Sequence, residues 1–278
     1  MILGVPCYEN HELTAQLVAS LAETVRGWDF TLVIIDNASP TPYDAAEWGY
    51  VHFPVCVIRN AVNEGNFYPL AQVRDLEPHH EVVALCHNDL IFYERGWDVR
   101  VRHAFRDDPQ LGMVGFAGSW EINGYGAREH GTTMSNLRGE RGHISAEGAG
   151  VRITDLRPSV AVDGLFMAFR REALAALTLN RALPPAHFYD FIWGAEIIEA
   201  GWRQATMGVE IDHIGWSTEV KLADALDGEW RRWCADNGVI PGAKPMEAIW
   251  RLAESQWKAR FKDRFWPCAI GPDWTISR

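Results

Sequence analysis

The sequence lacks any apolar run that approaches the roughly 20 residues needed to span a bilayer. It also lacks a basic region or a cleavage site at its start, where Met1–Gly4 leads directly into an apolar segment. We therefore expect no transmembrane segment and no targeting signal, and by default a cytoplasmic location.

Cysteine is scarce and carries no recognisable pattern. The five cysteines are odd in number and show no C-x-x-C spacing, so the sequence indicates neither a disulfide framework nor a zinc site. Cys7, Cys56 and Cys86 lie in or beside apolar runs, and we expect them to be small core residues.

Positive charge is also limited, with 26 Lys and Arg against 37 Asp and Glu and a net charge of −11. Residues 229–278 hold nine Lys or Arg against six Asp or Glu, a net of +3, so residues 1–228 carry −14. An acidic body disfavours non-specific binding to nucleic acids or anionic membranes. The basic, Trp-rich tail is open to two interpretations: local contact with such partners, or amphipathic helices packed on the core.

Strands and helices alternate over about the first 115 residues, which predicts a parallel sheet with right-handed crossovers. The 278 residues and the apolar fraction of 47% suffice for one large α/β domain or two small ones. The expected strands are Ile2–Pro6, Thr31–Ile35, Val55–Ile58 and Val82–Cys86. The expected helices begin after Asn10, around Tyr68–Leu76 and at Trp97–Phe105.

Polar residues follow each expected strand. In a parallel sheet these carboxyl ends share one edge, where open α/β sheets bind their ligands. The residues that would line this crevice are Tyr8, Asp36, Asn60, Asn63 and Asp89. The pair Asn88-Asp89, within the stretch Leu85–Phe92, is open to a second interpretation, because Asn and Asp also start turns and cap helices.

The second half of the chain is less regular. A strand is expected at Leu111–Phe116, but residues 118–150 are rich in glycine and lack apolar periodicity, which predicts a long irregular excursion. Strand character returns at Val160–Phe169, with a helix from Arg170, a further helix to Glu199 and a strand near Ala205–Val209.

A series of segments, in order and at the expected spacing over roughly residues 2–218, resembles the family 2 glycosyltransferases. Leu85–Asp89 stands where that family has an acidic metal motif. The others are Val5–Tyr8, Ile34–Ser39, Arg59–Asn66, Gly96-Trp97, the segment around Asp190, and Asp212–Ser217. The resemblance implies the GT-A fold: an α/β, Rossmann-like and mostly parallel sheet flanked by helices. It implies a glycosyltransferase domain at 1–218, with a nucleotide-sugar-binding half at 1–117 and an acceptor-binding, catalytic half at 118–218. Residues 219–278 would form a C-terminal helical extension.

The implied reaction is an inverting, metal-dependent hexosyl transfer from a nucleotide sugar, expected to be UDP-linked, to an acceptor hydroxyl. Asp89 would bind Mn²⁺ or Mg²⁺, and His213 matches a late histidine that completes the metal shell, although a single histidine is often structural. The residues expected to bind the nucleotide sugar are Pro6, Tyr8, Asp36, Asn37, Asn60, Asn63, Gly65 and Asn88.

Asp190 matches the family's catalytic base, which would remove the proton of the acceptor hydroxyl. Three residues near Asp190 differ from the family's pattern: Tyr189 replaces a Glu, Ile192 replaces a second Asp, and Glu196 replaces an Arg. Asp190 is also open to an interpretation as the N-cap of its helix. His87 replaces the acid or amide often found in the metal motif.

The acceptor is the least determined partner. Asp163, Gly164 and Trp120 are candidates to border its site, although Asp163-Gly164 also suits an ordinary turn, and the excursion 118–150 is the expected lid. The acceptor would be a saccharide, a glycoconjugate or DNA with hydroxylated bases. The aromatic and basic stretches that favour DNA are Trp230–Trp233 and Trp257–Trp266.

Two other classes of function compete. A nucleotidyltransferase normally carries a Gly-rich, basic phosphate loop after its first strand, and Pro6–Asn10 is not one. A catalytically inactive nucleotide-sugar-binding module is compatible with the substitutions at Tyr189 and Ile192. The oligomeric state is not indicated.

Overall fold

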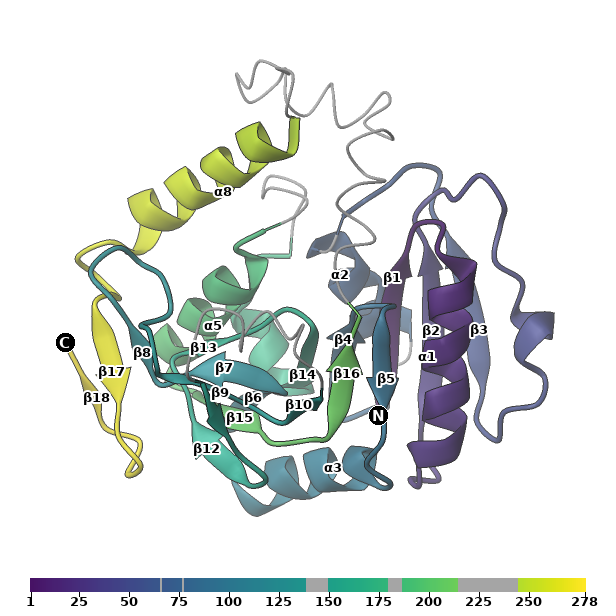
Figure 1. The fold of residues 1–278 in the computed structure, drawn as a ribbon, viewed down its shortest axis with the longest axis horizontal. Coiled ribbons are helices and arrows are strands. Elements are labelled where there is room, and N and C mark those ends of the chain that lie inside the picture. The colour runs from purple at the N-terminus through teal and green to yellow at the C-terminus, as the bar shows by residue number, and fades with distance from the viewer. Residues whose placement is uncertain (66, 77, 139–149, 180–186, 215–244) are drawn as a thin grey trace.

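The computed structural model describes residues 1–65, 67–76, 78–138, 150–179, 187–214 and 245–278 (Figure 1). The strands of its first half are β1 (Ile2–Cys7), β2 (Thr31–Asp36), β3 (Val55–Arg59), β4 (Val82–Cys86), β5 (Leu90–Phe92) and β6 (Leu111–Gly115). The helices between them are α1 (His11–Thr24), the 3₁₀ helix η1 (Ala45–Trp48), α2 (Phe67–Leu76) and α3 (Trp97–Asp107). The alternation predicted from the sequence is therefore confirmed.

The later elements begin with β7 (Ala117–Ser119), β8 (Glu121–Ile122), β9 (Thr133–Ser135), β10 (Leu137–Arg138), β11 (Val151–Arg152), β12 (Leu156–Pro158), β13 (Ala161–Val162) and β14 (Phe166–Arg170). After these come the 3₁₀ helix η2 (Arg171–Ala176), α5 (Tyr189–Glu199), β15 (Arg203–Met207) and β16 (Ile211–His213). The chain closes with α8 (Pro245–Phe261), β17 (Cys268–Ile270) and β18 (Ile276–Ser277).

The central sheet has eight strands in the order β12-β15-β6-β14-β4-β1-β2-β3. β1 pairs in parallel with β2 and β4, β2 with β3, and β6 with β15. Only β14 and β12 run against their neighbours. The sheet is thus mostly parallel, as expected, and β14 joins the two halves of the chain inside one sheet.

Helices cover both faces of this sheet, because its central strands are apolar on both sides. α1 and α3 pack on the face that carries Leu3, Ile34 and Ala84. α2 and α5 pack on the opposite face, against Val33 and Leu85. The result is a three-layer α/β fold.

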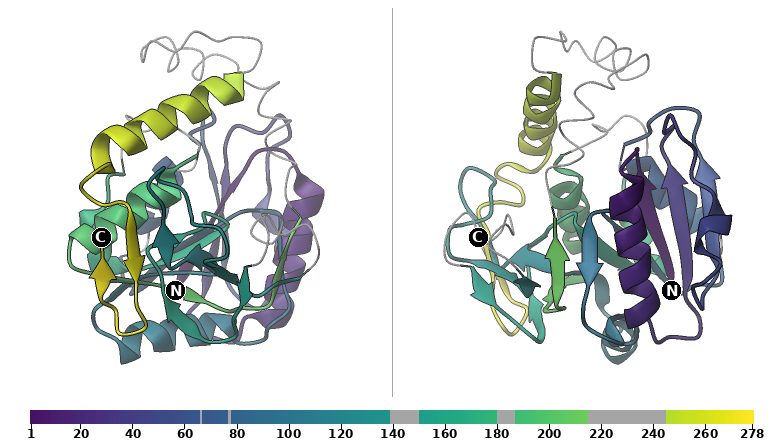
Figure 2. Two further views of the ribbon diagram at one scale, coloured as in Figure 1. Left: turned by 60° about the vertical axis from the view of Figure 1, so that its left-hand side comes forward. Right: turned by 45° about the vertical axis from the view of Figure 1, so that its right-hand side comes forward.

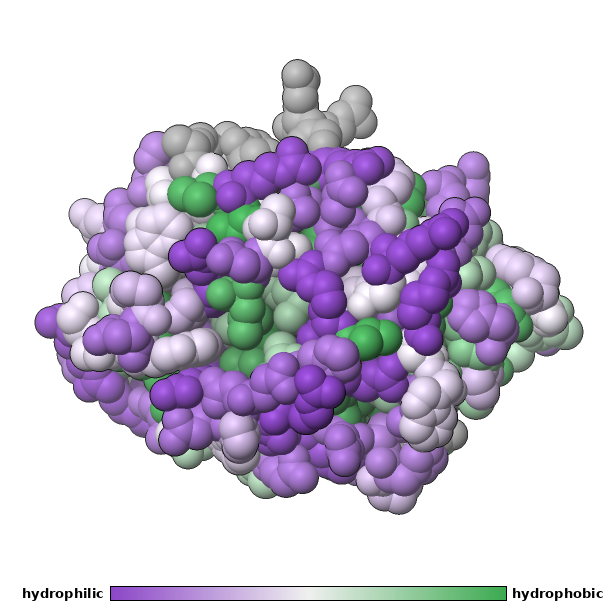
Figure 3. All heavy atoms as spheres, turned by 90° about the horizontal axis from the view of Figure 1, so that it is seen from below, coloured by the Kyte–Doolittle hydropathy of each residue, from purple (hydrophilic) through white to green (hydrophobic). Residues whose placement is uncertain are grey.

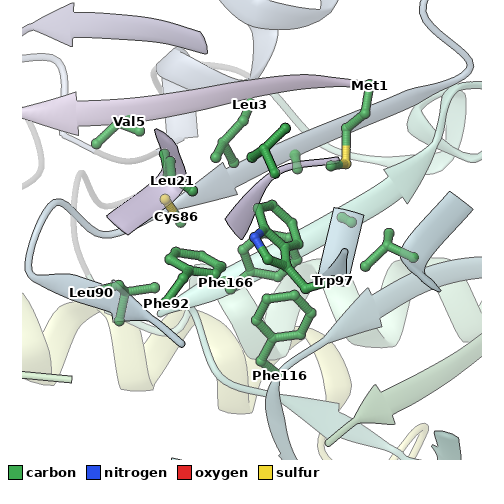
Figure 4. Packing of buried hydrophobic residues seen from close by; sticks show 14 of the residues in the cluster. Met1, Leu3, Val5, Leu21, Cys86, Leu90, Phe92, Trp97, Phe116 and Phe166 are labelled. Carbon is green, nitrogen blue, oxygen red and sulfur yellow. The ribbon is translucent and has the colours of Figure 1, made fainter. Parts of the chain in front are cut away.

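An aromatic cluster fills the core under α3 (Figure 4). The rings of Phe116 and Phe166 stack with centroids 3.7 Å apart, and Trp97 meets both rings edge-on. Phe92 lies against Trp97 at 4.6 Å. This packing fixes β5, and with it the segment between β4 and β5.

The excursion at 118–150 is not irregular where the structure describes it, so that prediction was wrong. β7, β9, β11 and β13 form one small sheet, β10 pairs with β16, and β8 pairs with β17. Two- and three-residue strands leave no apolar periodicity long enough to read from sequence. Residues 139–149 lie outside the described residues.

Two other expectations need correction. The strand predicted at Val160–Phe169 is two strands, β13 and β14, separated by a turn at Asp163-Gly164. The helix expected from Arg170 is the short η2.

The C-terminal part is not purely helical. It contains α8 followed by the hairpin β17–β18, which lies beside β8 (Figures 1 and 2). Trp257, Phe261, Phe265 and Trp266 are all at most 3% exposed, so these aromatics form part of the core and cannot stack on a nucleic acid. Residues 215–244, which include Trp230–Trp233, lie outside the described residues.

No helix among the described residues is both long and apolar enough to cross a membrane. The face seen in Figure 3 is covered mostly by hydrophilic side chains, with hydrophobic ones in small separate groups.

Candidate functional site

The end of β4 carries the site. β4 is buried along its whole length and delivers His87, Asn88 and Asp89 to the edge of the sheet before β5 begins. β16 pairs antiparallel with β5 and places His213 opposite Leu90, while the backbone N–H of Ile214 donates to the carbonyl of Asp89. Residues far apart in the sequence therefore meet at this edge.

His87, Asp89 and His213 form a cluster that could hold a metal ion, since one ligand atom from each lies within 4.8 Å of the others. Asp89 Oδ1 is 3.4 Å from His213 Nε2 and 4.0 Å from His87 Nδ1. This oxygen is buried and has no hydrogen-bond partner among the described residues. A buried carboxylate oxygen without such a partner, flanked by two imidazoles, fits a divalent cation.

The electrostatics of the cluster keep Asp89 ionised. Burial alone would raise the pKa of Asp89, but His213 and His87 outweigh it and hold that pKa below its usual value. Burial likewise opposes the charged form of His213, yet Asp89 and Asp163 raise its pKa. The pKa of His87 is lowered, chiefly by burial.

Tyr189 fixes the orientation of His87. Its hydroxyl donates to the carbonyl of Gly164 at 3.3 Å and lies 3.0 Å from His87 Nε2. With its proton given to Gly164, the hydroxyl accepts from Nε2–H, which leaves Nδ1 of the neutral ring as a lone pair on the side of Asp89. His87, which the sequence left without a metal role, is thus oriented as a ligand.

Gly164 is required at its position by Tyr189. A Cβ atom there would lie 2.1 Å from the Tyr189 hydroxyl oxygen, so no larger residue fits without displacing the tyrosine. The turn at Asp163-Gly164 therefore serves the site as well as the connection from β13 to β14.

A second group of charges lies beside the first. Arg128 contacts Asp163 Oδ2 at 3.3 Å and Asp190 Oδ2 at 2.9 Å, and it donates to the carbonyl of Val162 at 2.7 Å. The other oxygen of Asp190 accepts from the backbone N–H of Phe191. Phe188 is the N-cap of α5, so Asp190 is in the first turn and is not the cap.

The pKa values of Asp163 and Asp190 are shifted in opposite directions. Burial raises the pKa of Asp190, Arg128 opposes this and Asp163 adds to it, so that the pKa stays above its usual value. For Asp163 burial acts in the same direction, but Arg128 and His213 hold its pKa below its usual value. Asp190 is therefore the stronger proton acceptor of the two.

Asp36, one of the residues expected to bind the nucleotide, is fully buried. Its carboxylate accepts from the backbone N–H groups of Ser39 and Tyr43, and it forms an ion pair with Arg59. In this structure it braces the loop after β2.

Four other residues expected to bind the nucleotide sugar are joined by hydrogen bonds in the loops that follow β2 and β3. Asn60 donates to Asn37 Oδ1 at 2.8 Å, and Asn37 donates to the carbonyl of Gly65 at 3.2 Å. Asn63 Oδ1 accepts from Gly65 N–H, which stabilises the positive φ of 65° at that glycine. The network shapes the loop between β3 and α2.

The remaining expected residues lie on several elements. Pro6 lies in β1 opposite Ile35, and Tyr8 is half-buried just after that strand. Asn88 is 5% exposed and donates to Thr14 Oγ1 at 3.1 Å, so its amide contacts α1. Trp120 is half-buried, and its backbone carbonyl accepts from Ile270.

Sequence reasoning missed Arg128. It lies in the glycine-rich excursion, where no periodicity or strand end marks it, and only its pairing with two distant carboxylates shows its place. No pattern in the sequence links Tyr189 to His87, because the two residues are 102 positions apart.

Comparisons with known proteins agree on the fold. No protein-family model matches the chain, and no curated protein does. Among solved structures, mannosyltransferase PcManGT from Pyrobaculum calidifontis, in complex with GDP-Man and Mn²⁺, is 17% identical with a TM-score of 0.55, covering 92% of this chain and 71% of that one. GalNAc-T7 with UDP, GalNAc and Mn²⁺ is 13% identical with a TM-score of 0.60, covering 94% of this chain and 56% of that one.

S. aureus TarS 1-349 in complex with UDP is also similar, at 13% identity and a TM-score of 0.55, covering 94% of this chain and 72% of that one. The chain thus spans about half of GalNAc-T7 and about seven-tenths of the other two. At these identities the likeness shows the fold, which is that of the GT-A glycosyltransferases.

Proposed function

We propose that this protein transfers a sugar from a nucleotide-sugar donor to an acceptor hydroxyl, with a divalent cation and with inversion at the anomeric carbon. The observation that carries the proposal is the cluster of His87, Asp89 and His213 at the edge of a GT-A sheet, joined through Tyr189 to the helix that bears Asp190. The similar solved structures with nucleotide, sugar and Mn²⁺ support the same class of donor.

Asp89 and His213 would hold the cation, with His87 as a third ligand oriented by Tyr189. A cation bound there would stabilise the negative charge that develops on the leaving diphosphate. Two imidazoles and one carboxylate suit Mn²⁺ better than Mg²⁺, which prefers oxygen ligands.

The nucleotide would lie along the ends of β1, β2 and β3. Tyr8 and Asn63 would contact the nucleotide, and Asp36, Asn37 and Asn60 would shape the loops that follow β2 and β3. Pro6 and Gly65 would shape the backbone at the end of β1 and before α2, and Asn88 would hold the end of β4 against α1. A UDP-linked donor is the first to test.

Asp190 would act as the general base. Its carboxylate is held by Arg128 and by Phe191 N–H, and its raised pKa suits a group that accepts a proton from a hydroxyl. As the acceptor oxygen attacks the anomeric carbon, its proton passes to Asp190 and the bond from that carbon to the diphosphate breaks. Asp163, Gly164 and Trp120 would border the acceptor.

The proposed domains follow from these roles. Residues 1–117 would bind the nucleotide sugar, 118–218 would hold the acceptor and the base, and 219–278 would form a C-terminal extension of mixed structure. Because β14 lies between β4 and β6, the two halves share one core.

A thermal-shift screen of nucleotide sugars with and without Mn²⁺, followed by an assay for nucleotide release, tests the proposal. We expect one donor to stabilise the protein only with the cation and to be turned over with an acceptor or slowly with water. Stabilisation without any turnover would favour an inactive binding module, and the absence of any stabilisation would refute nucleotide-sugar binding.

A further inference from the structure

We propose that Arg128 is a positioning residue that holds the carboxylate of Asp190 in place for the acceptor, and that the C-terminal segment acts on the site by holding Arg128. The inference rests on the proposed function, because it takes Asp190 as the base. It concerns a residue on an element that neither binds the donor nor belongs to the metal cluster.

The contact geometry shows one guanidinium shared by two carboxylates. Different nitrogens of Arg128 reach Asp163, at 3.3 Å, and Asp190, at 2.9 Å. The side chains of all three residues are at most 22% exposed, so solvent screens the group weakly. The planar fork of an arginine can satisfy both partners at once, which a lysine cannot match.

The charges explain why the base needs this arginine. Two carboxylates that lie close together and are poorly solvated disfavour simultaneous ionisation, and Asp163 raises the pKa of Asp190 in this way. Arg128 lets both remain ionised, so Asp190 stays able to accept a proton. Once Asp190 is protonated, Asp163 still balances the arginine, and the arrangement persists through the transfer.

Further contacts fix the side chain of Arg128. It donates to the backbone carbonyl of Val162, and its guanidinium lies 4.7 Å from the ring centroid of Phe191. Each of these partners is the sequence neighbour of one acid: Val162 precedes Asp163, and Phe191 follows Asp190. The guanidinium is therefore tied to the same two segments whose carboxylates it joins.

The backbone that carries Arg128 is held from the C-terminal side. Arg128 forms a bridge with Ile122 across a tight turn, in which Asn123 N–H donates to the carbonyl of Ala127. At the tip of this turn, the carbonyl of Gly126 accepts from Trp257 Nε1 of α8 at 3.0 Å.

The fit at the tip is close. A Cβ atom at Gly126 would lie 2.8 Å from both Trp257 and Trp266, and the positive φ of 77° there favours glycine. β17 also pairs with β8, the strand that leads into the turn. The aromatic C-terminal residues thus clamp the turn that presents Arg128.

Replacement of Arg128 tests the positioning role. In Arg128→Ala we expect kcat for transfer to fall about 100-fold, since a small misplacement of a reacting group has an effect of this order. The dissociation constant of the donor with Mn²⁺ should be unchanged. Arg128→Lys should retain more activity, and added guanidinium ion should restore part of the activity of Arg128→Ala.

Trp257→Phe tests the support of the turn, because it removes the hydrogen bond to Gly126 and keeps most of the ring volume. We expect a several-fold loss of kcat, again with donor affinity unchanged.

Arg106→Ala, at an exposed arginine of α3, is the matched control for Arg128→Ala and should behave as wild type. Wild-type kcat in Arg128→Ala would overturn the proposal, and so would a loss confined to donor affinity.

A measurement without turnover separates this inference from the proposed function. In a double-mutant cycle of Arg128→Ala and Asp190→Ala, the shifts in Tm should be non-additive, because each change removes the contact between the guanidinium and the carboxylate. If the wild type turns over no nucleotide sugar, the proposed function fails, while the cycle still decides whether Arg128 holds Asp190. Additive shifts would overturn the inference even in an active enzyme.

Discussion

The hydroxyl of Tyr189 lies 3.0 Å from Nε2 of His87, so the first residue of α5 contacts the first residue after β4. These are two of the positions at which the chain departs from the family it resembles. A tyrosine and a histidine at these positions form a hydrogen bond with each other. The two departures thus meet in one contact.

Removal of that contact should weaken the metal site. In Tyr189→Phe, His87 loses the acceptor that fixes its ring, and we expect the affinity for Mn²⁺ to fall about tenfold, as for other outer-shell partners of metal-binding histidines. Calorimetric titration with Mn²⁺ measures this. Tyr125→Phe, at a residue that is 84% exposed, is the control. Unchanged affinity in Tyr189→Phe would contradict the role of Tyr189 in orienting His87.

Asp89 should be the strongest determinant of metal binding. Asp89→Asn removes the single carboxylate of the cluster, so we expect binding of Mn²⁺ to fall at least about 100-fold and metal-dependent donor binding to disappear. In the wild type, Mn²⁺ should bind more tightly than Mg²⁺. Calorimetry with each ion checks both statements, and Asp75→Asn, an exposed residue of α2, serves for comparison.

Asp190→Asn should separate binding from chemistry. The amide keeps the shape of the carboxylate and cannot accept the proton, so donor affinity should stay the same while kcat falls by about 10² to 10⁴. Binding by calorimetry and release of nucleotide by the transfer assay give the two values. Normal turnover would exclude Asp190 as the base.

The rate should depend on pH through Asp190. Burial and Asp163 raise its pKa against the effect of Arg128, so the base becomes protonated, and kcat falls, at a higher pH than for an ordinary aspartate. Asp163→Asn removes a negative neighbour and should shift this acidic limb to lower pH. Profiles of kcat against pH for the two proteins test the shift, and an unmoved limb would mean that another group is being titrated.

Phe166→Ala should destabilise the fold without touching the site directly. Its ring is fully buried and stacks on Phe116, so the substitution leaves a cavity that costs about 3 to 5 kcal/mol. Urea unfolding measures the change, and His52→Ala, at an exposed residue before β3, should change stability little. A loss under about 1 kcal/mol would mean that the aromatic cluster repacks.

The parallel strands are predictable because their buried runs are apolar on both faces, as in β2 and β4, and because polar residues end each of them. That pattern also predicts the position of Asp89 at the edge of the sheet. The side-chain directions are not predictable from it: Asn88 contacts Thr14, and Asp36 contacts Arg59. Such choices depend on neighbours from other elements.

The second half is predicted less well for two physical reasons. Strands as short as β8 and β13 carry too few residues for a period-2 signal. In the stretch that begins at Trp257, aromatic residues of the core alternate with basic residues of the surface. Its aromatic rings are buried, and Arg260 and Arg264 form ion pairs with Glu196 and Glu199. Composition alone cannot distinguish such a stretch from a nucleic-acid-binding surface.

The pairing of β8 with β17 joins Ile122 to Cys268, residues that are far apart in the sequence. Contacts of such long sequence separation form slowly, because a large loop must close before they stabilise the chain. The central sheet requires no residue beyond β15, so we expect it to form first. The turn that carries Arg128 would then be the last part of the candidate site to form.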